Sequence, residues 1–344
     1  MRLMNLNRIL PIAFASVILA ISTLHVFAQS PFQRFSITGT AQGTTYSVVY
    51  YSNEKYIQKH SIDSLLNAID SSLSIYKKFS IISRFNNGTG PIKIDAHLDQ
   101  VIKMSRSIHN DTKGIFDITI GRLTDYWGFG INTPTEQANK TQLKASLSCK
   151  GMDKISIVDS FLFKADPCIK LDVNGIAQGY SVDLMAQLLL KYGLNDFIIE
   201  LGGEILISGK KLTTNEPIKI AIEFPAESSY ERSDSLLQLI INYGAVTTSG
   251  IYKKNVESST KKVNHLFDAR NGKSVSNNLI AVTVWAHDAT SADGYDNALM
   301  VMGLKKGLKF IEKRKDLAAI FFFRSENGQI RMKASSRFAP FIVK

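Results

Sequence analysis

A short polar segment after residue 264 holds side chains that are suited to proton transfer. The run HLFDARNGKS places His265, Asp268 and Arg270 within six residues of one another. A histidine titrates near neutral pH, so His265 can accept a proton from an attacking hydroxyl group. Asp268 and Arg270 would either orient that histidine or form a structural ion pair, and we favour the ion pair.

A second pair of polar side chains lies in residues 290–302, where an apolar stripe predicts a helix. Asp293 and Asn297 are one turn apart on the same face of this helix. A carboxylate and an amide oxygen in that arrangement can ligate a hard cation such as Mg²⁺, provided that another oxygen completes the site. The alternative is an ordinary solvated surface, which is the more common outcome for such a pair.

The stretch from residue 169 to residue 208 organises the rest of the chain. Residues 169–173 alternate as a strand does, Asn174 is the expected N-cap of a helix ending at Gly193, and strands are predicted at 197–201 and 204–208. The start of a helix after a small-residue turn presents free N–H groups and suits a phosphate or pyrophosphate. The alternative is that Asn174 and Gly175 only begin a helix.

The other periodic segments predict an α+β fold. Strands are expected at 35–51 (a pair), 218–223, 236–241, 279–285 and 318–323, with helices at 57–73 and 98–108. The run GIFDITIGRLTDYWGFG (114–130) is rich in aromatic residues and glycine, and it includes Phe116 and Asp117. Aromatic faces beside a carboxylate can hold a planar heterocycle, although aromatic clusters more often belong to a core.

The first 28 residues differ from the rest of the chain. Arg2 and Arg8 precede an almost wholly apolar run, and a cleavage-like sequence ends at Ala28. This pattern predicts a signal peptide (1–28), one catalytic domain (29–344), and export to the periplasm or the outer face of the inner membrane. The alternative is an uncleaved segment that associates the protein with the membrane, because the apolar run nearly has the length of a span.

Charge and cysteine content narrow the possible functions. The formal net charge is +11, and +9 without Arg2 and Arg8, but the lysines are spread along the chain and predict no nucleic-acid binding. Cys149 and Cys168 flank a predicted hairpin (154–158 and 161–165), which would bring them opposite each other. An exported protein is therefore expected to form this disulfide.

Common catalytic motifs do not occur in the sequence. HExxH, CxxC, GxSxG and a GxGxxG after a strand are missing, which argues against zinc proteases, thioredoxin-like proteins, α/β-hydrolases and Rossmann dehydrogenases. Gly272, Lys273 and Ser274 imitate the end of a P-loop, but Phe267 stands where its first glycine should be. We therefore reject a P-loop.

Eight segments in succession resemble the ApbE family of FAD:protein FMN transferases. The resemblance covers about residues 36–325, and the segments occur in the family's order: GTAQGTTYSV (39–48), SIYKKFSIISRFN (74–86), GIFDITIGRLTDYWGFG (114–130), LDVNGIAQGYSVD (171–183), IELGGEI (199–205), AVTTSG (245–250), HLFDARNGKSV (265–275) and VTVWAHDATSADGYDNALMVMG (282–303). The resemblance implies the α+β, tunnelling-fold-like architecture of that family.

The resemblance also implies an activity and a set of site residues. The family takes FAD as substrate with Mg²⁺, splits the pyrophosphate and attaches FMN to a threonine hydroxyl of a partner protein. The implied acceptors are subunits of membrane-bound redox complexes. By position, the resemblance makes His265 the catalytic base; Ala177 (through its carbonyl), Asp293 and Asn297 the metal ligands; and Gln42, Tyr76, Ile115, Phe116, Asp117, Asn174, Tyr180 and Phe267 the flavin contacts.

The sequence departs from the family pattern at several of these positions. Asn297 stands where threonine is common, which keeps an oxygen ligand but changes its reach. Gln42, Gln178 and Ala269 replace a methionine, a lysine or acid, and a proline. No departure removes an indispensable charge, so we expect the transferase activity. The alternatives are an Mg²⁺-dependent FAD pyrophosphatase, with water as the acceptor, and a protein that binds FAD without turnover.

Overall fold

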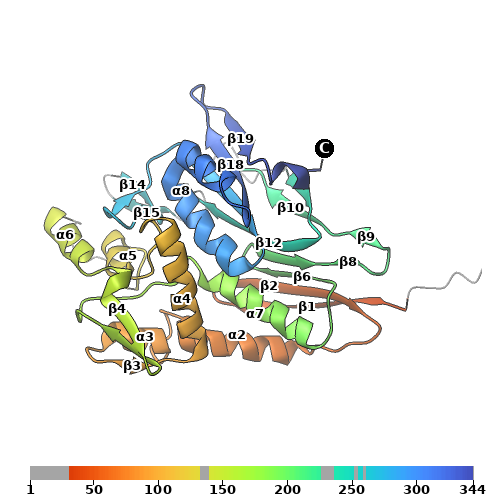
Figure 1. Ribbon diagram of the computed structural model, residues 1–344, viewed down its shortest axis with the longest axis horizontal. Coiled ribbons are helices and arrows are strands. Elements are labelled where there is room, and N and C mark those ends of the chain that lie inside the picture. Colours follow the sequence, from red (N-terminus) through yellow and green to blue (C-terminus); the bar gives the residue numbers. More distant parts are fainter. Residues whose placement is uncertain (1–30, 132–138, 226–235, 252–254, 259–260, 344) are drawn as a thin grey trace, which may run out of the picture.

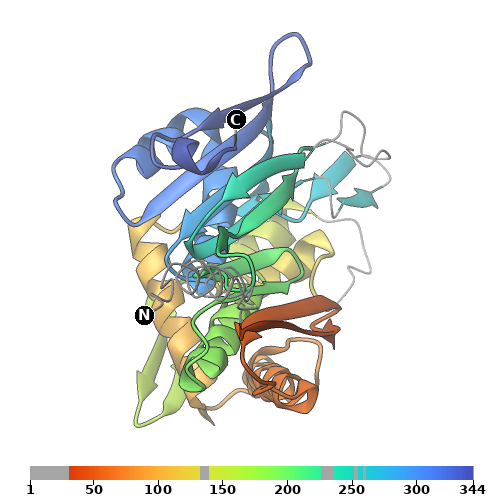
Figure 2. The same ribbon diagram turned by 90° about the vertical axis from the view of Figure 1, so that its right-hand side faces the viewer.

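The protein is built around one antiparallel sheet of eight strands. The computed structural model describes residues 31–131, 139–225, 236–251, 255–258 and 261–343, so the predicted signal peptide lies outside the described residues. The strand order is β1-β2-β6-β7-β12-β17-β18-β19. Figures 1 and 2 show the N-terminal strands at one edge of this sheet and the C-terminal strands at the other. The strands are β1 (Gln33–Ala41), β2 (Thr44–Ser52), β6 (Phe197–Leu201), β7 (Glu204–Ser208), β12 (Tyr243–Gly250), β17 (Leu279–Ala286), β18 (Leu317–Arg324) and β19 (Ile330–Ala334).

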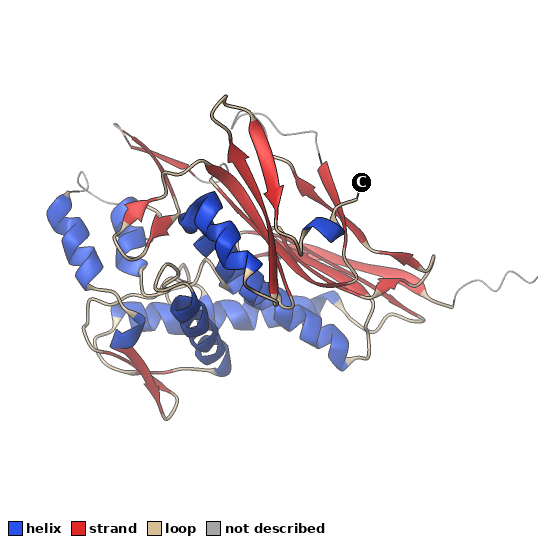
Figure 3. Cartoon of the chain, turned by 45° about the horizontal axis from the view of Figure 1, so that its top comes forward, coloured by secondary structure: helices blue, strands red, loops and turns tan. Residues whose placement is uncertain are grey.

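Four long helices pack on one face of the sheet, and Figure 3 shows them gathered on that side. They are α2 (Lys59–Leu73), α4 (Ala96–Asp111), α7 (Ala177–Lys191) and α8 (Ala289–Glu312). Gly303 interrupts α8 with φ 75°, a conformation that glycine adopts without steric cost. The larger hydrophobic core lies between these helices and the sheet.

The opposite face of the sheet carries a second, smaller core. In β18, Phe321 joins the core under the helices, whereas Ile320 and Phe322 join the second core. This alternation is the two-residue period of a strand that is buried on both faces. The hairpin of β10 (Lys219–Glu223) and β11 (Leu236–Ile240) and the 3₁₀ helix Ala339–Phe341 contribute to this second core.

The remaining elements lie around this framework. The helices are α3 (Ile81–Asn87), α5 (Gly121–Trp127), α6 (Lys140–Ser148) and a 3₁₀ turn (Met152–Lys154). A three-stranded sheet joins β3 (Ile92–Lys93), β5 (Phe161–Lys164) and β4 (Ile155–Val158). Three further short pairs are β8 (Lys210–Lys211) with β9 (Glu216–Pro217), β13 (Asn255–Ser258) with β14 (Lys261–Asn264), and β15 (Phe267–Asp268) with β16 (Lys273–Ser274).

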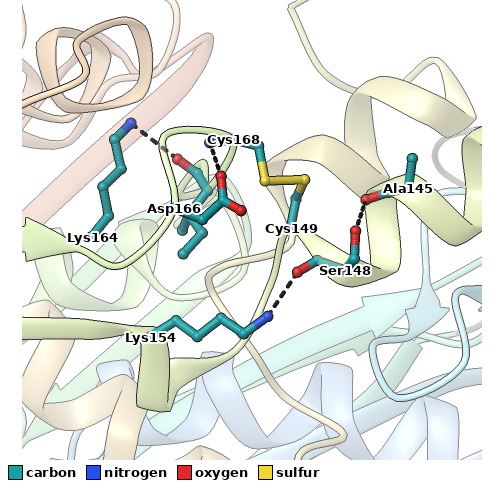
Figure 4. The surroundings of a disulfide bond; sticks show 8 residues. Ala145, Ser148, Cys149, Lys154, Lys164, Asp166 and Cys168 are labelled. Carbon is teal, nitrogen blue, oxygen red and sulfur yellow. Dashed lines mark hydrogen bonds between the residues drawn. A yellow bond between two sulfur atoms is a disulfide. The ribbon is translucent and has the colours of Figure 1, made fainter.

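The predicted hairpin and disulfide are both confirmed. The turn between β4 and β5 has positive φ at Asp159 (48°) and Ser160 (65°), as in the tight turns that match strand twist. A disulfide joins Cys149, at the end of α6, to Cys168, with their Cα atoms 5.4 Å apart (Figure 4). The disulfide therefore fastens α6 to the loop that leads into the stretch before α7.

Two local predictions were wrong. Residues 169–173 do not form a regular strand, and only Lys170 bridges to Ile120. On one side the segment bonds to the backbone of Ile118 and Gly121. On the other side, in place of a neighbouring strand, the side chain of Asn86 both donates to and accepts from the backbone of Leu171 (2.8 and 2.7 Å). Asn174 is not the N-cap of α7, because a turn intervenes and Ile176 takes that position.

The α+β class is confirmed by this arrangement of helices against antiparallel strands. The predicted C′ glycine of α7 is also confirmed, because Gly193 has φ 73° and its N–H reaches the carbonyl of Leu190. Within the described part of the chain, no helix combines the length and the apolar character that a membrane crossing needs.

Candidate active site

One cavity of about 360 Å³ brings together most of the residues that the sequence singled out. This volume lies within the range of small-molecule sites. Nine of the twelve predicted site residues line it: Tyr76, Ile115, Phe116, Asp117, Asn174, His265, Phe267, Asp293 and Asn297. They come from loops, short strands and α8, which are far apart in the sequence.

The start of α7 meets α8 at the floor of this cavity. The backbone N–H of Gly179 donates to Oδ2 of Asp293 at 3.0 Å. A Cβ atom at Gly179 would lie 2.3 Å from the carbonyl oxygen of Ala289, so only glycine permits this approach. The first turn of α7, predicted as an anion site, is therefore already partly occupied by a carboxylate of the same chain.

Three buried carboxylates from β7 and α8 line the cavity. Asp293 is 4% exposed and Asp296 2% exposed, and Glu204 is also buried. Burial raises the pKa of Asp293 to about 7, and the charge of Asp183 adds to this effect. Burial and then the charge of Asp293 raise the pKa of Asp296 well above its usual range. We call Glu204, Asp293, Asp296 and Asn297 the acidic wall.

The oxygen atoms of the acidic wall are held by hydrogen bonds. Thr247 donates to Oδ2 of Asp296 at 2.8 Å, while Oδ1 of Asp296 accepts no hydrogen bond from the residues that the structure describes. Asn297 accepts from Ser249 at 3.2 Å and donates to the carbonyl of Asp293 at 2.9 Å. The amide of Asn297 is thereby fixed, with its oxygen toward β12.

His265 also lines the cavity, next to aromatic side chains. The ring of Phe129 meets His265 edge to face with centroids 6.1 Å apart, and it also contacts Phe267 at 5.8 Å. Trp127 stacks on Phe267 at 6.2 Å and donates to the carbonyl of Gly272 at 2.9 Å. We call Phe129, His265 and Phe267 the aromatic wall.

Asp268 and Arg270 form the structural ion pair that we favoured from the sequence. The guanidinium of Arg270 donates twice to the carboxylate of Asp268, at 2.9 and 2.7 Å. The backbone N–H of Arg270 also donates to Asp268 at 3.0 Å. Arg270 helps to hold the pKa of Asp268 below its usual range, against the opposing effect of burial. These bonds stabilise the turn between β15 and β16.

Three predicted site residues do not line the cavity. Gln42 donates to the hydroxyl of Ser181 at 2.7 Å. The hydroxyl of Tyr180 contacts Nδ1 of His97 at 3.0 Å, and burial raises the pKa of Tyr180 to about 12. The carbonyl of Ala177 accepts from Ser181 at 2.8 Å within α7. Ala177 is two residues from Gly179, so it belongs to the same helix turn that Asp293 contacts.

Sequence reasoning missed several residues that line the cavity. Asp296 and Glu204 are the most important, and Asp172 and Gln178 accompany them. The signal for Asp296 was its position three residues after Asp293, which puts both on one side of a helix. Glu204 follows the Gly202–Gly203 turn, and no spacing rule connects it with α8.

The charged side chains that line the cavity indicate whether a cation fits there. Its described lining includes five carboxylates, from Asp117, Asp172, Glu204, Asp293 and Asp296, and neither lysine nor arginine. An oxygen-rich, acidic donor set of this kind fits a hard divalent cation. Among the described residues, no group of three or more His, Cys, Asp or Glu side chains has the geometry to hold a metal. A cation here would therefore also need amide, backbone or substrate oxygens.

The fold and this cavity define an α+β protein with a small-molecule site that combines an acidic wall with an aromatic one. The profile of the ApbE family matches residues 42–321. The FAD:protein FMN transferase of Vibrio cholerae is 31% identical over 95% of this chain and 99% of its own. That of Haemophilus influenzae is 32% identical over 88% of this chain and 90% of its own.

Solved structures agree with the sequence comparisons. The flavin transferase ApbE from Vibrio cholerae aligns with a TM-score of 0.79 at 29% identity, covering 90% of this chain and all of that one. The apo form of the Pseudomonas stutzeri flavinyl transferase ApbE gives 0.80 at 28% identity, covering 90% and 97%. The chain belongs to the ApbE family. It is a flavin-transferring transferase with FAD as a fitting substrate, as the resemblance predicted.

Proposed function

We propose that this protein uses Mg²⁺ to transfer FMN from FAD to a threonine hydroxyl of a partner protein. The threonine oxygen attacks the phosphorus of the FMN half, the bond from that phosphorus to the bridging oxygen breaks, and AMP leaves. The threonine ends as a phosphoester, and its proton passes to His265. The observation that carries this proposal is a single cavity lined both by His265 and by buried carboxylates.

Charge balance supports a metal-dependent reaction. A dinucleotide diphosphate is an anion, and the described lining of the cavity offers it five carboxylates without a lysine or an arginine. Like charges at close range in a site of low dielectric repel strongly. Asp293 and the oxygen of Asn297 would hold Mg²⁺, with the Ala177 carbonyl as a third ligand. When bound, Mg²⁺ would neutralise the charge that develops on the phosphoryl oxygens.

His265 is the residue best placed to take the proton of the acceptor. It is the only histidine that lines the cavity among the described residues. Phe129 packs against its ring and is itself in contact with Phe267, and Trp127 anchors the turn that follows. A base held in this way needs little reorganisation before it acts.

We also propose that the protein is exported and modifies subunits of membrane-bound redox complexes in the same compartment. The disulfide between Cys149 and Cys168 supports an oxidising compartment. Intact mass analysis of the mature protein tests the export part. A chain that begins after Ala28 is expected, and a full-length chain retained in the cytoplasm would contradict it.

The central test uses FAD, Mg²⁺ and a candidate acceptor domain that contains a threonine. We expect an acceptor with the added mass of FMN, fluorescent in a denaturing gel, together with one AMP per FMN attached. The matched control is the same acceptor with that threonine changed to valine. Rapid release of free FMN and AMP without acceptor would instead indicate a pyrophosphatase. Intact bound FAD under all conditions would indicate a binding protein.

A further inference from the structure

His109 lies directly behind the part of the chain that presents Phe116 and Asp117 to the cavity. It belongs to the last turn of α4, and its side chain is 24% exposed. Its Nδ1 atom is 2.9 Å from the carbonyl oxygen of Phe116 and 3.6 Å from Oδ2 of Asp117. His109 does not itself line the cavity. It therefore contacts two residues of the site from the protein side.

The chemistry of these contacts fixes the role of Nδ1. A carbonyl oxygen only accepts hydrogen bonds, so Nδ1 of His109 carries the hydrogen and donates to Phe116. The 3.6 Å separation from Asp117 exceeds a hydrogen bond. His109 thus holds the backbone at Phe116 without occupying the Oδ2 oxygen of Asp117.

The two carboxylate oxygens of Asp117 have different surroundings. Oδ1 accepts from the backbone N–H of Thr119 at 2.8 Å and from its hydroxyl at 2.5 Å. Oδ2 accepts no hydrogen bond from the described residues, although Asp117 is only 4% exposed and lines the cavity. A buried acceptor without a donor is costly. A donor on the bound substrate would remove that cost.

The turn between α4 and Phe116 is tightly built. Gly114 has φ 79°, a conformation that glycine adopts without steric cost. The N–H of Gly114 donates to the carbonyl of His109 at 2.8 Å, and the N–H of Phe116 donates to the hydroxyl of Thr112 at 3.2 Å. Loss of the His109 ring would remove the hydrogen bond that its Nδ1 atom donates to the carbonyl of Phe116.

We propose that His109 is a positioning residue, which holds Asp117 so that Oδ2 accepts from an N–H group on a heterocycle of the bound flavin dinucleotide. A carboxylate is an acceptor only, so its partner must be a donor. FAD offers two such sources, the imide N–H of the flavin and the amino group of adenine. This inference rests on the proposed function in taking FAD as the substrate.

The test compares His109→Leu and His109→Gln with His60→Gln, a change of an exposed histidine in α2. Binding of FAD is followed by flavin fluorescence, and transfer is measured separately. We expect His109→Leu to raise the Kd and KM for FAD about tenfold with little change in kcat. The amide of His109→Gln can donate to Phe116 and should restore most of the affinity. His60→Gln should match the wild type.

Two FAD analogues locate the donor, one methylated at the flavin imide nitrogen and one with an unsubstituted purine in place of adenine. The wild type should bind one of them about tenfold more weakly than FAD, and His109→Leu should lose that discrimination. Equal binding of both analogues and FAD by the wild type would overturn the proposal. A loss of kcat with unchanged KM in both His109 variants would also overturn it.

Binding affinities keep this test separate from the proposed transfer reaction. If the wild type binds FAD but modifies no acceptor, the proposed function fails while the affinity comparison still decides the role of His109. Thermal unfolding of each variant checks the fold. If His109→Leu is unfolded, the comparison of His109→Gln with the wild type for the two analogues remains decisive, because that variant should keep the discrimination.

Discussion

The two walls of the cavity differ in how the fold supports them. The acidic wall stands on β7, β12 and α8, which are central elements packed against the main core. The aromatic wall stands on the two-residue strand β15 and on the end of the seven-residue helix α5. The proposed metal ligands Asp293 and Asn297 therefore belong to a central element, while His265, the proposed proton acceptor, lies on a peripheral segment. This difference would suit the proposed reaction, in which a second protein must approach the cavity.

The largest effect is expected from the aromatic wall. His265→Ala should lower FMN transfer by about 10²–10⁴-fold, the usual contribution of a general base. FAD binding and thermal stability should change little, because the acidic wall remains intact. Transfer is measured by acceptor fluorescence and binding by titration. The matched control is His287→Ala, since His287 contacts Trp285 and does not line the cavity. If His265→Ala transferred FMN at the normal rate, His265 would not be the general base.

The acidic wall should show a different response, in which activity and metal dependence disappear together. Asp293→Asn should lower transfer on the order of 10²-fold and abolish stabilisation by Mg²⁺. In the wild type the proton would compete with Mg²⁺ for Asp293, because the pKa of Asp293 is raised to about 7. The rise in Tm on adding Mg²⁺ should therefore be larger near about pH 8 than near about pH 6. A pH-independent rise, or the same rise in Asp293→Asn, would contradict the ligand assignment.

The sequence predicted the acidic wall only in part. Asp293 and Asn297 follow from helix periodicity, and the α+β class follows from the alternation of strands such as β2 and β18. The contribution of Glu204 depends on β7 lying beside β12, whose position is set by long-range strand pairing. Local patterns carry no information about such pairing, so the third carboxylate became visible only in the fold.

The two wrong predictions of local structure also arose because contacts from other parts of the chain override the local pattern. Residues 169–173 have the alternation of a strand, but the backbone of Leu171 bonds to the side chain of Asn86, 85 residues away in the sequence. Asn174 has the chemistry of an N-cap, yet the turn before Ile176 moves the start of α7. By contrast, the disulfide followed from a local hairpin with a tight turn, and that prediction was correct.

The disulfide provides a way to weaken one wall without the other. Leu143 and Leu147 of α6 lie close to Gly272, in the turn after the aromatic wall, and Cys149 ends the same helix. Replacing Cys149 and Cys168 with serine should cost about 3 kcal/mol of unfolding free energy, as expected for a loop of this length. Urea unfolding measures this loss. Stabilisation by Mg²⁺ should persist in the folded variant, and its disappearance would show that the two walls are not independent.

The smallest effect is expected at Asp183 of α7, and it concerns the pH dependence of the unfolding free energy. Its carboxylate accepts from the backbone N–H of Ala289 (2.7 Å) and of Thr290 (2.9 Å), and burial raises its pKa to about 6. A raised carboxyl pKa favours the folded state at low pH, and this contribution is lost as the pH rises through about 6. Asp183→Asn should reduce the loss of unfolding free energy between low and neutral pH by on the order of 2 kcal/mol.

The measurement is the difference in unfolding free energy between Asp183→Asn and the wild type, without metal, at several pH values. The variant should gain stability relative to the wild type between about pH 4 and pH 7, because only the wild type must ionise a buried carboxyl group in that range. The charge of Asp183 also raises the pKa of Asp293, so loss of that charge should lower the pKa of Asp293. A difference that stays constant with pH would show that Asp183 titrates normally in the folded protein. Asp183 would then act on the acidic wall only through its bonds to the start of α8.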